Sequence, residues 1–196
     1  MTPLQLRMTA ALDGLEARWR EVHAPVLARL RPGLSIVEMD ALADEYGYEL
    51  GEQQRAWWAW HDGAERRDDT RDTDLWVKPY STLFSLREAL DFAAEAKTWN
   101  PTANELPMAW DPTWLPFLRG GGEWVSRTAS PGGPSAVTDS KIFPIGEYYA
   151  TDSIEHFVDI WCWGIDHGVL VLEAGVWENR AGLVPVPEIF DVMGIF

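Results

Sequence analysis

The fold is constrained most by the stretch from residue 110 to residue 138, which reads WDPTWLPFLRGGGEWVSRTASPGGPSAVT. Two Xaa-Pro steps stiffen the backbone in its first part, and the three glycines that begin at Gly120 predict a turn. Residues 123–126 and 135–138 each predict a short strand, and the proline- and glycine-rich residues 130–134 turn the chain between them. The stretch therefore predicts strands joined by tight turns.

Length and composition bound the class of protein. The 196 residues are 46% hydrophobic, which is enough to bury one sizeable core and predicts one domain with extensions. No apolar run follows a positive region at the N-terminus, and no stretch approaches the roughly 18 uninterrupted apolar residues of a membrane span. The single cysteine, Cys162, excludes an internal disulfide framework and lies in an apolar run where a buried thiol is expected. We therefore expect a soluble, cytoplasmic protein.

The net charge of −15 at pH 7 is large for this length and is unevenly distributed. Residues 1–34 carry five Arg against three acids, whereas 35–64 carry seven acids against Arg55 and 142–196 carry nine acids against Arg180. Repulsion from phosphates disfavours direct nucleic-acid binding, while a negative field speeds the encounter with a basic protein. An acidic surface can also do no more than keep a protein in solution, so the charge by itself identifies no partner.

Apolar spacing predicts an N-terminal helix and a second, capped helix. An apolar seam runs from Met8 to Val26 at intervals of three and four residues, and Pro25 bends or ends this helix. The seam is shorter than the three or four heptads of a coiled coil, so we expect it to pack on the core. Ser35 and Glu38 have the spacing of a capping box and begin a helix that stops near Gly47. Its expected inward positions are Ile36, Met39 and Leu42.

A tryptophan-rich segment after residue 50, EQQRAWWAWHDG, predicts the next helix. Trp57 and Trp60 share one face of this helix while Trp58 points elsewhere, so we expect one indole at the surface. Residues 65–74 predict a solvated loop because they include no apolar side chain, and a short strand is predicted at 75–77.

Capping signals also begin two later helices. Ser85 and Glu88 repeat the capping-box spacing at the start of a helix through Ala96. The last helix begins near Ser153. Its apolar stripe consists of Ile154, Phe157, Val158, Trp161 and Ile165. The run 169–172 then predicts a strand, and we expect the apolar residues 189–196 to pack on the domain.

The sequence contains no recognisable catalytic or metal-binding motif. It has no zinc-type histidine pair, no paired CxxC, no phosphate-binding loop ending in Lys-Ser and no nucleophile elbow. His156 and His167 would share a helix face about 16 Å apart, which is too far for them to hold one metal ion. We therefore expect no metal, no cofactor and no enzymatic activity.

The twelve tryptophans allow carbohydrate binding or glycoside hydrolysis as a minor alternative. Indole faces stack on sugars, and Glu155 and Asp159 share a helix face. Exposed carboxylates at this spacing lack the burial that raises the pKa of a catalytic acid. Most of the tryptophans are better explained as core and groove residues.

Several motifs follow one another in a distinctive order between residues 35 and 168. The capped helix is followed by Tyr48-Glu-Leu50, a helix, His61-Asp-Gly63, Leu83-Phe-Ser-Leu86 with its helix, residues 110–117, the glycine turns at 120–122 and 132–133, and the helix start at 153–157. This order resembles the SUKH superfamily, specifically its Smi/Knr cell-wall-regulator-like branch. Gly51 stands where the family commonly has proline. Residues 1–34, a helical extension, and 169–196, a C-terminal extension packed on the domain, lie outside the resemblance.

The resemblance implies a single α+β domain with an antiparallel sheet flanked by helices, and no catalytic residues. Bacterial domains of this kind are mostly immunity proteins that neutralise a polymorphic toxin, often a nuclease, while fungal relatives are linked to wall synthesis and signalling. The acidic balance agrees with the first use, because carboxylates complement a basic toxin surface. A regulatory scaffold with several weak partners is the alternative function. The resemblance leaves the identity of the toxin and the oligomeric state open.

We expect the partner to contact the first acidic block, one exposed indole and the carboxylates of the last helix. The predicted contact residues are Asp40, Asp44, Glu45, Glu49, Trp58, Asp62, Glu155 and Asp159. The alternative is that these carboxylates form only a solvated face, since most exposed charges have no specific partner.

Overall fold

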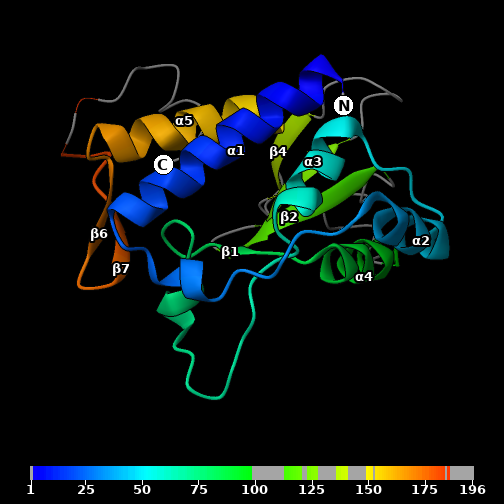
Figure 1. The fold of residues 1–196 in the computed structure, drawn as a ribbon, viewed down its shortest axis with the longest axis horizontal. Coiled ribbons are helices and arrows are strands. Elements are labelled where there is room, and N and C mark those ends of the chain that lie inside the picture. Colours follow the sequence, from blue (N-terminus) through cyan, green and yellow to red (C-terminus); the bar gives the residue numbers. More distant parts are fainter. Residues whose placement is uncertain are drawn as a thin grey trace, which may run out of the picture.

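A computed structural model of the chain describes residues 2–98, 113–120, 123–127, 136–140, 149–151, 153–183 and 185, with the backbone alone at 123–127, 136–140 and 149–151. These residues form a mixed α+β structure (Figure 1). Its α-helices are α1 (Pro3–Glu21), α2 (Ile36–Tyr46), α3 (Glu52–Trp60), α4 (Leu86–Ala96) and α5 (Ile154–Asp166). Two short 3₁₀ helices, η1 (Pro25–Ala28) and η2 (Asp72–Leu75), lie in the connections.

One antiparallel sheet has its strands in chain order, β1-β2-β3-β4-β5. The strands are β1 (Thr82–Leu83), β2 (Trp114–Arg119), β3 (Glu123–Arg127), β4 (Ala136–Ser140) and β5 (Tyr149–Thr151). The strands predicted at 123–126 and 135–138 are confirmed as β3 and β4. The register of β2 on β3 shifts between Pro116 and Leu118. A proline has no N–H to donate, so a ladder that includes one is commonly irregular there.

The capping signals begin helices where they were predicted. Ser35 with Glu38 and Ser85 with Glu88 form complete capping boxes at the starts of α2 and α4. In each box the serine hydroxyl accepts from the glutamate N–H, and the glutamate carboxylate accepts from the serine N–H. Gly47 ends α2 with a positive φ of 61°, a conformation that glycine adopts without steric cost.

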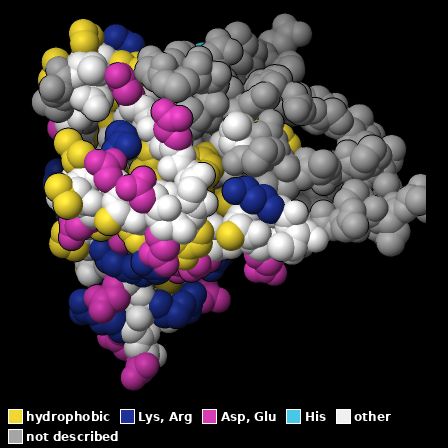
Figure 2. Space-filling model, turned by 90° about the vertical axis from the view of Figure 1, so that its right-hand side faces the viewer, with side chains coloured by type: hydrophobic (Ala, Val, Ile, Leu, Met, Phe, Trp, Pro, Cys, Tyr) yellow, Lys and Arg dark blue, Asp and Glu magenta, His cyan; other side chains and the backbone are white. Residues whose placement is uncertain are grey.

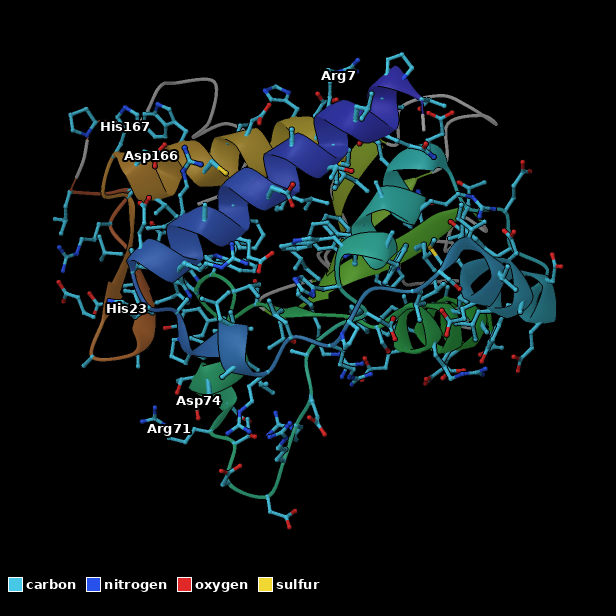
Figure 3. The ribbon with its side chains drawn as sticks, in the orientation of Figure 1. Arg7, His23, Arg71, Asp74, Asp166 and His167 are labelled. Atoms are coloured by element: carbon cyan, nitrogen blue, oxygen red, sulfur yellow. The ribbon has the colours of Figure 1, made fainter. Side chains whose placement is uncertain are left out.

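The helix α1 crosses the molecule beside α5, and the two run in the same direction (Figures 1 and 3). Arg7 donates to Glu155 at one end, with Nε–Oε1 at 2.9 Å. Arg18 and Asp166 pair at the other end, with Nε–Oδ1 at 2.7 Å. Helix α3 packs against the opposite flank of α1, whereas α2 packs against α4 and α3. The acidic helices α2 and α5 thus lie in different parts of the fold.

The core is built from the apolar stripes of these helices and from β2. The N-terminal seam contributes Met8, Leu12, Leu15 and Trp19, all fully buried. Trp19 meets Trp161 of α5 with ring centroids 5.6 Å apart, and Trp57 meets Phe117 of β2 at 5.0 Å. Aromatic contacts of this kind are tilted or edge-on, as ring quadrupoles favour. The terminal elements therefore share one core with the central ones.

A two-stranded hairpin follows α5 and consists of β6 (Leu170–Glu173) and β7 (Val176–Asn179). It confirms the strand predicted at 169–172, and Trp177 of β7 is buried against the core. Cys162 is buried in α5 as expected, and burial raises the pKa of its thiol to about 11. A thiol with so high a pKa is almost entirely protonated at neutral pH and is therefore a poor nucleophile.

Two local predictions were wrong. Residues 75–77 are not a strand, because Leu75 ends η2 and Val77 lies in a bend. Ile36 was expected to face inward, but its side chain is 65% exposed, while Met39 of the same helix is buried. The turn at 130–134 and the tail at 189–196 lie outside the described residues. Within the part of the chain that is described, none of the helices combines the length and apolar character needed to cross a membrane.

Candidate protein-binding surface

The predicted contact carboxylates from Asp40 to Glu49 face solvent. They differ in whether an arginine of the chain already pairs with them. Asp40 pairs with Arg55 of α3, with Oδ1 and Nη1 2.6 Å apart. Glu45 pairs with Arg87 of α4 at 2.9 Å, and the hydrogen bond from Arg87 lowers the pKa of Glu45. Asp44 is exposed and makes no ion pair with any described residue, and Glu49 is also exposed. Asp44 is therefore the carboxylate of this group most available to a partner.

Trp58 does not belong to the surface, so its prediction as a contact residue was wrong. Its side chain is fully buried, and its indole Nε1 donates to the carbonyl oxygen of Phe84 at 3.2 Å. Helix α3 packs between other elements, so both Trp57 and Trp58 meet core residues. The partly exposed indole of this helix is that of Trp60.

Asp62 is half-buried and has a structural role. Its Oδ1 accepts the backbone N–H of Leu86 at 2.7 Å, which satisfies the first N–H of α4. Burial raises the pKa of this carboxyl, although the hydrogen bond from Leu86 opposes the shift. Asp62 is therefore occupied in joining the start of α4 to the segment after α3.

Asp62→Ala is expected to lower the free energy of unfolding by about 1–2 kcal/mol, because it leaves the Leu86 N–H without its acceptor. Asp62→Asn keeps an acceptor oxygen and is the matched control.

Folding raises the pKa of Asp62, so its ionisation destabilises the folded state as pH rises through the folded pKa. The stability of Asp62→Asn relative to wild type should therefore increase between about pH 3 and pH 7. Urea unfolding at both pH values measures this, and equal losses for the two variants would contradict it.

The two predicted carboxylates of α5 belong to a helix that packs beside α1, away from α2 (Figure 1). Glu155 accepts two hydrogen bonds from Arg7, so much of its charge is neutralised. Asp159 is exposed, and its pKa is raised by partial desolvation and by repulsion from Glu155. The predicted surface thus divides into separate parts, and α2 carries most of it.

A groove on the α1, α2 and α3 side was not predicted from the sequence. It has a volume of about 430 Å³. Its lining consists of Gln5, Thr9, Asp13, Ile36, Met39, Arg55, Ala56, Ala59 and Trp60. Ile36 and its neighbour Val37 are 65% and 77% exposed, which is unusual for large aliphatic side chains next to each other. Ala56 and Ala59 of α3, three residues apart, were a signal in the sequence, but only the packing shows that they lie under a hollow.

The end of the molecule where α2 and α4 lie carries both apolar and acidic side chains. Figure 2 faces this end and shows hydrophobic and acidic side chains interspersed at the upper left of the view, with Lys and Arg side chains more frequent below them. The chain's own arginines already pair with two of the carboxylates here, Asp40 and Glu45. A mixed surface of this kind is typical of protein-binding sites, where apolar anchors are surrounded by a polar rim.

The described residues offer little support for other kinds of site. Among them, no group of three or more His, Cys, Asp and Glu side chains is placed to hold a metal ion. Six indoles are buried and cannot stack on a sugar, namely those of Trp19, Trp57, Trp58, Trp114, Trp161 and Trp177. No protein-family model matches the chain. No curated protein matches it either.

Proposed function

We propose that this chain is an immunity protein of the SUKH type, which binds a cognate bacterial toxin directly and neutralises it without catalysis. The order of motifs between residues 35 and 168 is the basis for the family. The α+β architecture with an antiparallel sheet is the one that this resemblance implies. The proposed place of action is the cytoplasm, where the thiol of Cys162 stays reduced.

The observation that carries the proposal is the composition of the α2 surface. Its first turn exposes the aliphatic side chains of Ile36 and Val37. Its last turn exposes the carboxylate of Asp44, which makes no ion pair with any described residue, and that of Glu45, which Arg87 pairs with. Exposed apolar side chains on the same helix as acidic ones support the binding of a basic protein. Burial of the apolar side chains would give affinity, and the carboxylates would raise the association rate and the selectivity.

Neutralisation would follow from steric and electrostatic occlusion. A toxin that acts on nucleic acid needs a basic surface to hold phosphates. A protein with a net charge of −15 is attracted to that surface and competes with the phosphates for it. This mechanism needs tight, specific contact and no reaction on the immunity protein.

The proposal is tested by affinity purification of the tagged protein from its native cells at low salt, with mass spectrometry of the eluate and a toxicity rescue assay on the main partner. We expect one stoichiometric partner whose toxicity is suppressed by this protein. Many substoichiometric partners would instead favour a regulatory scaffold, and absence of rescue would reject the immunity function.

Asp44→Lys is expected to slow association with the basic partner by about three- to tenfold at low salt and to reduce the salt dependence of the rate. The reason is that Asp44 is exposed and is not neutralised by a described arginine. Stopped-flow or surface plasmon resonance at two ionic strengths measures the rate. Asp68→Lys, an equal charge change on the exposed loop that contains residues 65–70, is the matched control. Equal effects of the two variants would mean that only the net charge matters.

A further inference from the structure

The groove between α1, α2 and α3 has the dimensions of a helix-binding site. Gln5, Thr9 and Asp13 line one wall and are spaced by four residues, so they follow one another along α1. The rise of an α-helix places the first and last of them about 12 Å apart. This length accommodates about two turns of a helix lying along the groove.

The floor of the groove is formed by small side chains of α3. Ala56 and Ala59 both line it, and neither fills the space above the helix. Trp60 closes one end, where its indole Nε1 donates to Glu16 at 3.1 Å and its ring lies 5.5 Å from that of Trp19. Because these contacts fix the position of the Trp60 side chain, this side of the groove has a defined shape.

The other wall is apolar and projects into solvent. Ile36 and Met39 of α2 line the groove, and Val37 lies beside Ile36. Met39 is 1% exposed and so belongs to the floor, whereas Ile36 is 65% exposed. A partner that covered Ile36 would gain apolar burial that the chain itself does not provide.

The charges around the groove favour a basic occupant. Asp13 lines it, is exposed, and makes no ion pair with any described residue. The lining cation Arg55 is already paired with Asp40 at 2.6 Å, and Glu16, beside Trp60, is already paired with Arg20. A Lys or Arg side chain on the α1 side of an apolar stripe would therefore meet the carboxylate of Asp13.

We propose that the groove binds a short amphipathic helix of the protein partner, with aliphatic side chains over Ala56 and Ala59 and with a Lys or Arg on the flank that faces Asp13 of α1. This inference rests on the proposed function, since it assigns the segment through which the partner is held. The recognition is of the helix-in-groove kind, in which apolar anchors repeat at intervals of three and four residues.

The test is a selection from a displayed library of helical peptides of about 14 residues, randomised at the apolar and flanking positions. The target is the full-length chain. The enriched peptides are then titrated against wild type, Ile36→Ser and Ala59→Trp. Leu183→Ser is the matched control, because Leu183 is another aliphatic residue, 83% exposed, and follows the β6–β7 hairpin away from α2 (Figure 1). Circular dichroism establishes that each variant is folded.

We expect the enriched peptides to carry an apolar stripe with Lys or Arg on one flank. They should bind Ile36→Ser and Ala59→Trp at least about tenfold more weakly and bind Leu183→Ser as wild type. Asp13→Asn should weaken the salt dependence of binding. If no peptide is enriched, if neither flank is basic, or if Ile36→Ser binds equally well, the inference is overturned. Self-association of the wild type that is lost in Ile36→Ser would assign the groove to a second copy of the chain and would also overturn it.

The toxin assay separates this inference from the proposed function. Neutralisation that survives in Ile36→Ser and Ala59→Trp would leave the immunity function standing and reject the groove as the contact. Peptides that need the groove, in a protein that neutralises no toxin, would support helix binding and reject the immunity function.

Discussion

Trp58→Ala is expected to lower the free energy of unfolding by about 3–5 kcal/mol. The indole is fully buried, so its removal leaves a cavity between α3 and the rest of the core. It also removes the donor of the hydrogen bond to the Phe84 carbonyl, which precedes the capped start of α4. An unpaired buried carbonyl adds to the loss. Urea unfolding followed by circular dichroism measures the change.

Two variants make the Trp58 prediction specific. Trp58→Phe keeps most of the apolar volume but not the donor, so its loss should be smaller than that of Trp58→Ala. Val37→Ala removes an exposed side chain and should change stability by no more than about 0.5 kcal/mol. If Trp58→Ala were as stable as wild type and bound the partner more weakly, the Trp58 indole would have to lie at the surface. That result would contradict the structure.

Gly120→Ala is expected to destabilise the protein by at least about 3 kcal/mol. Gly120 follows β2 with a φ of 107°, which non-glycine residues rarely adopt. A Cβ at this position would also lie 1.8 Å from the backbone carbonyl oxygen of Tyr80. Because that atom belongs to the backbone, relief of the clash requires β1 and β2 to move apart. The thermal midpoint and the urea midpoint should both fall.

The control for this prediction is Gly182→Ala. Nothing lies within 4 Å of a Cβ added at Gly182, so its stability should stay within about 0.5 kcal/mol of wild type. Comparable midpoints for Gly120→Ala and Gly182→Ala would show that the chain after β2 can relax without cost. Such a result would reject the close approach of Gly120 to Tyr80.

The helices illustrate what could be predicted from local signals. Serine caps with a glutamate three residues later begin α2 and α4, because both hydrogen bonds of the box form within one turn. The apolar seam of α1 predicted its buried side, and the stripe of α5 did the same. Strands β3, β4 and β6 followed from turn residues and branched side chains. These features depend on neighbours in the sequence.

The candidate surface was only partly predictable, because exposure depends on what covers a side chain. The carboxylates of α2 could be predicted to face solvent because charged side chains are rarely buried. Ile36 continues the spacing of Met39 and was expected to face inward, yet no described element covers the first turn of α2 on that side. Trp58 lies off the stripe of Trp57 and was expected outside, but α3 is enclosed on more than one side.

The α+β class was implied by the resemblance, whereas local patterns in the sequence by themselves determined the starts of the capped helices and the acidic character. These properties arise from backbone hydrogen bonds, side-chain periodicity and charge, which act over short distances along the chain. Only the tertiary structure decided that Asp62 caps α4, that the α5 carboxylates lie apart from α2, and that α1 and α2 leave a groove over Ala56 and Ala59. Each of these depends on contacts between residues far apart in sequence, which local patterns do not encode.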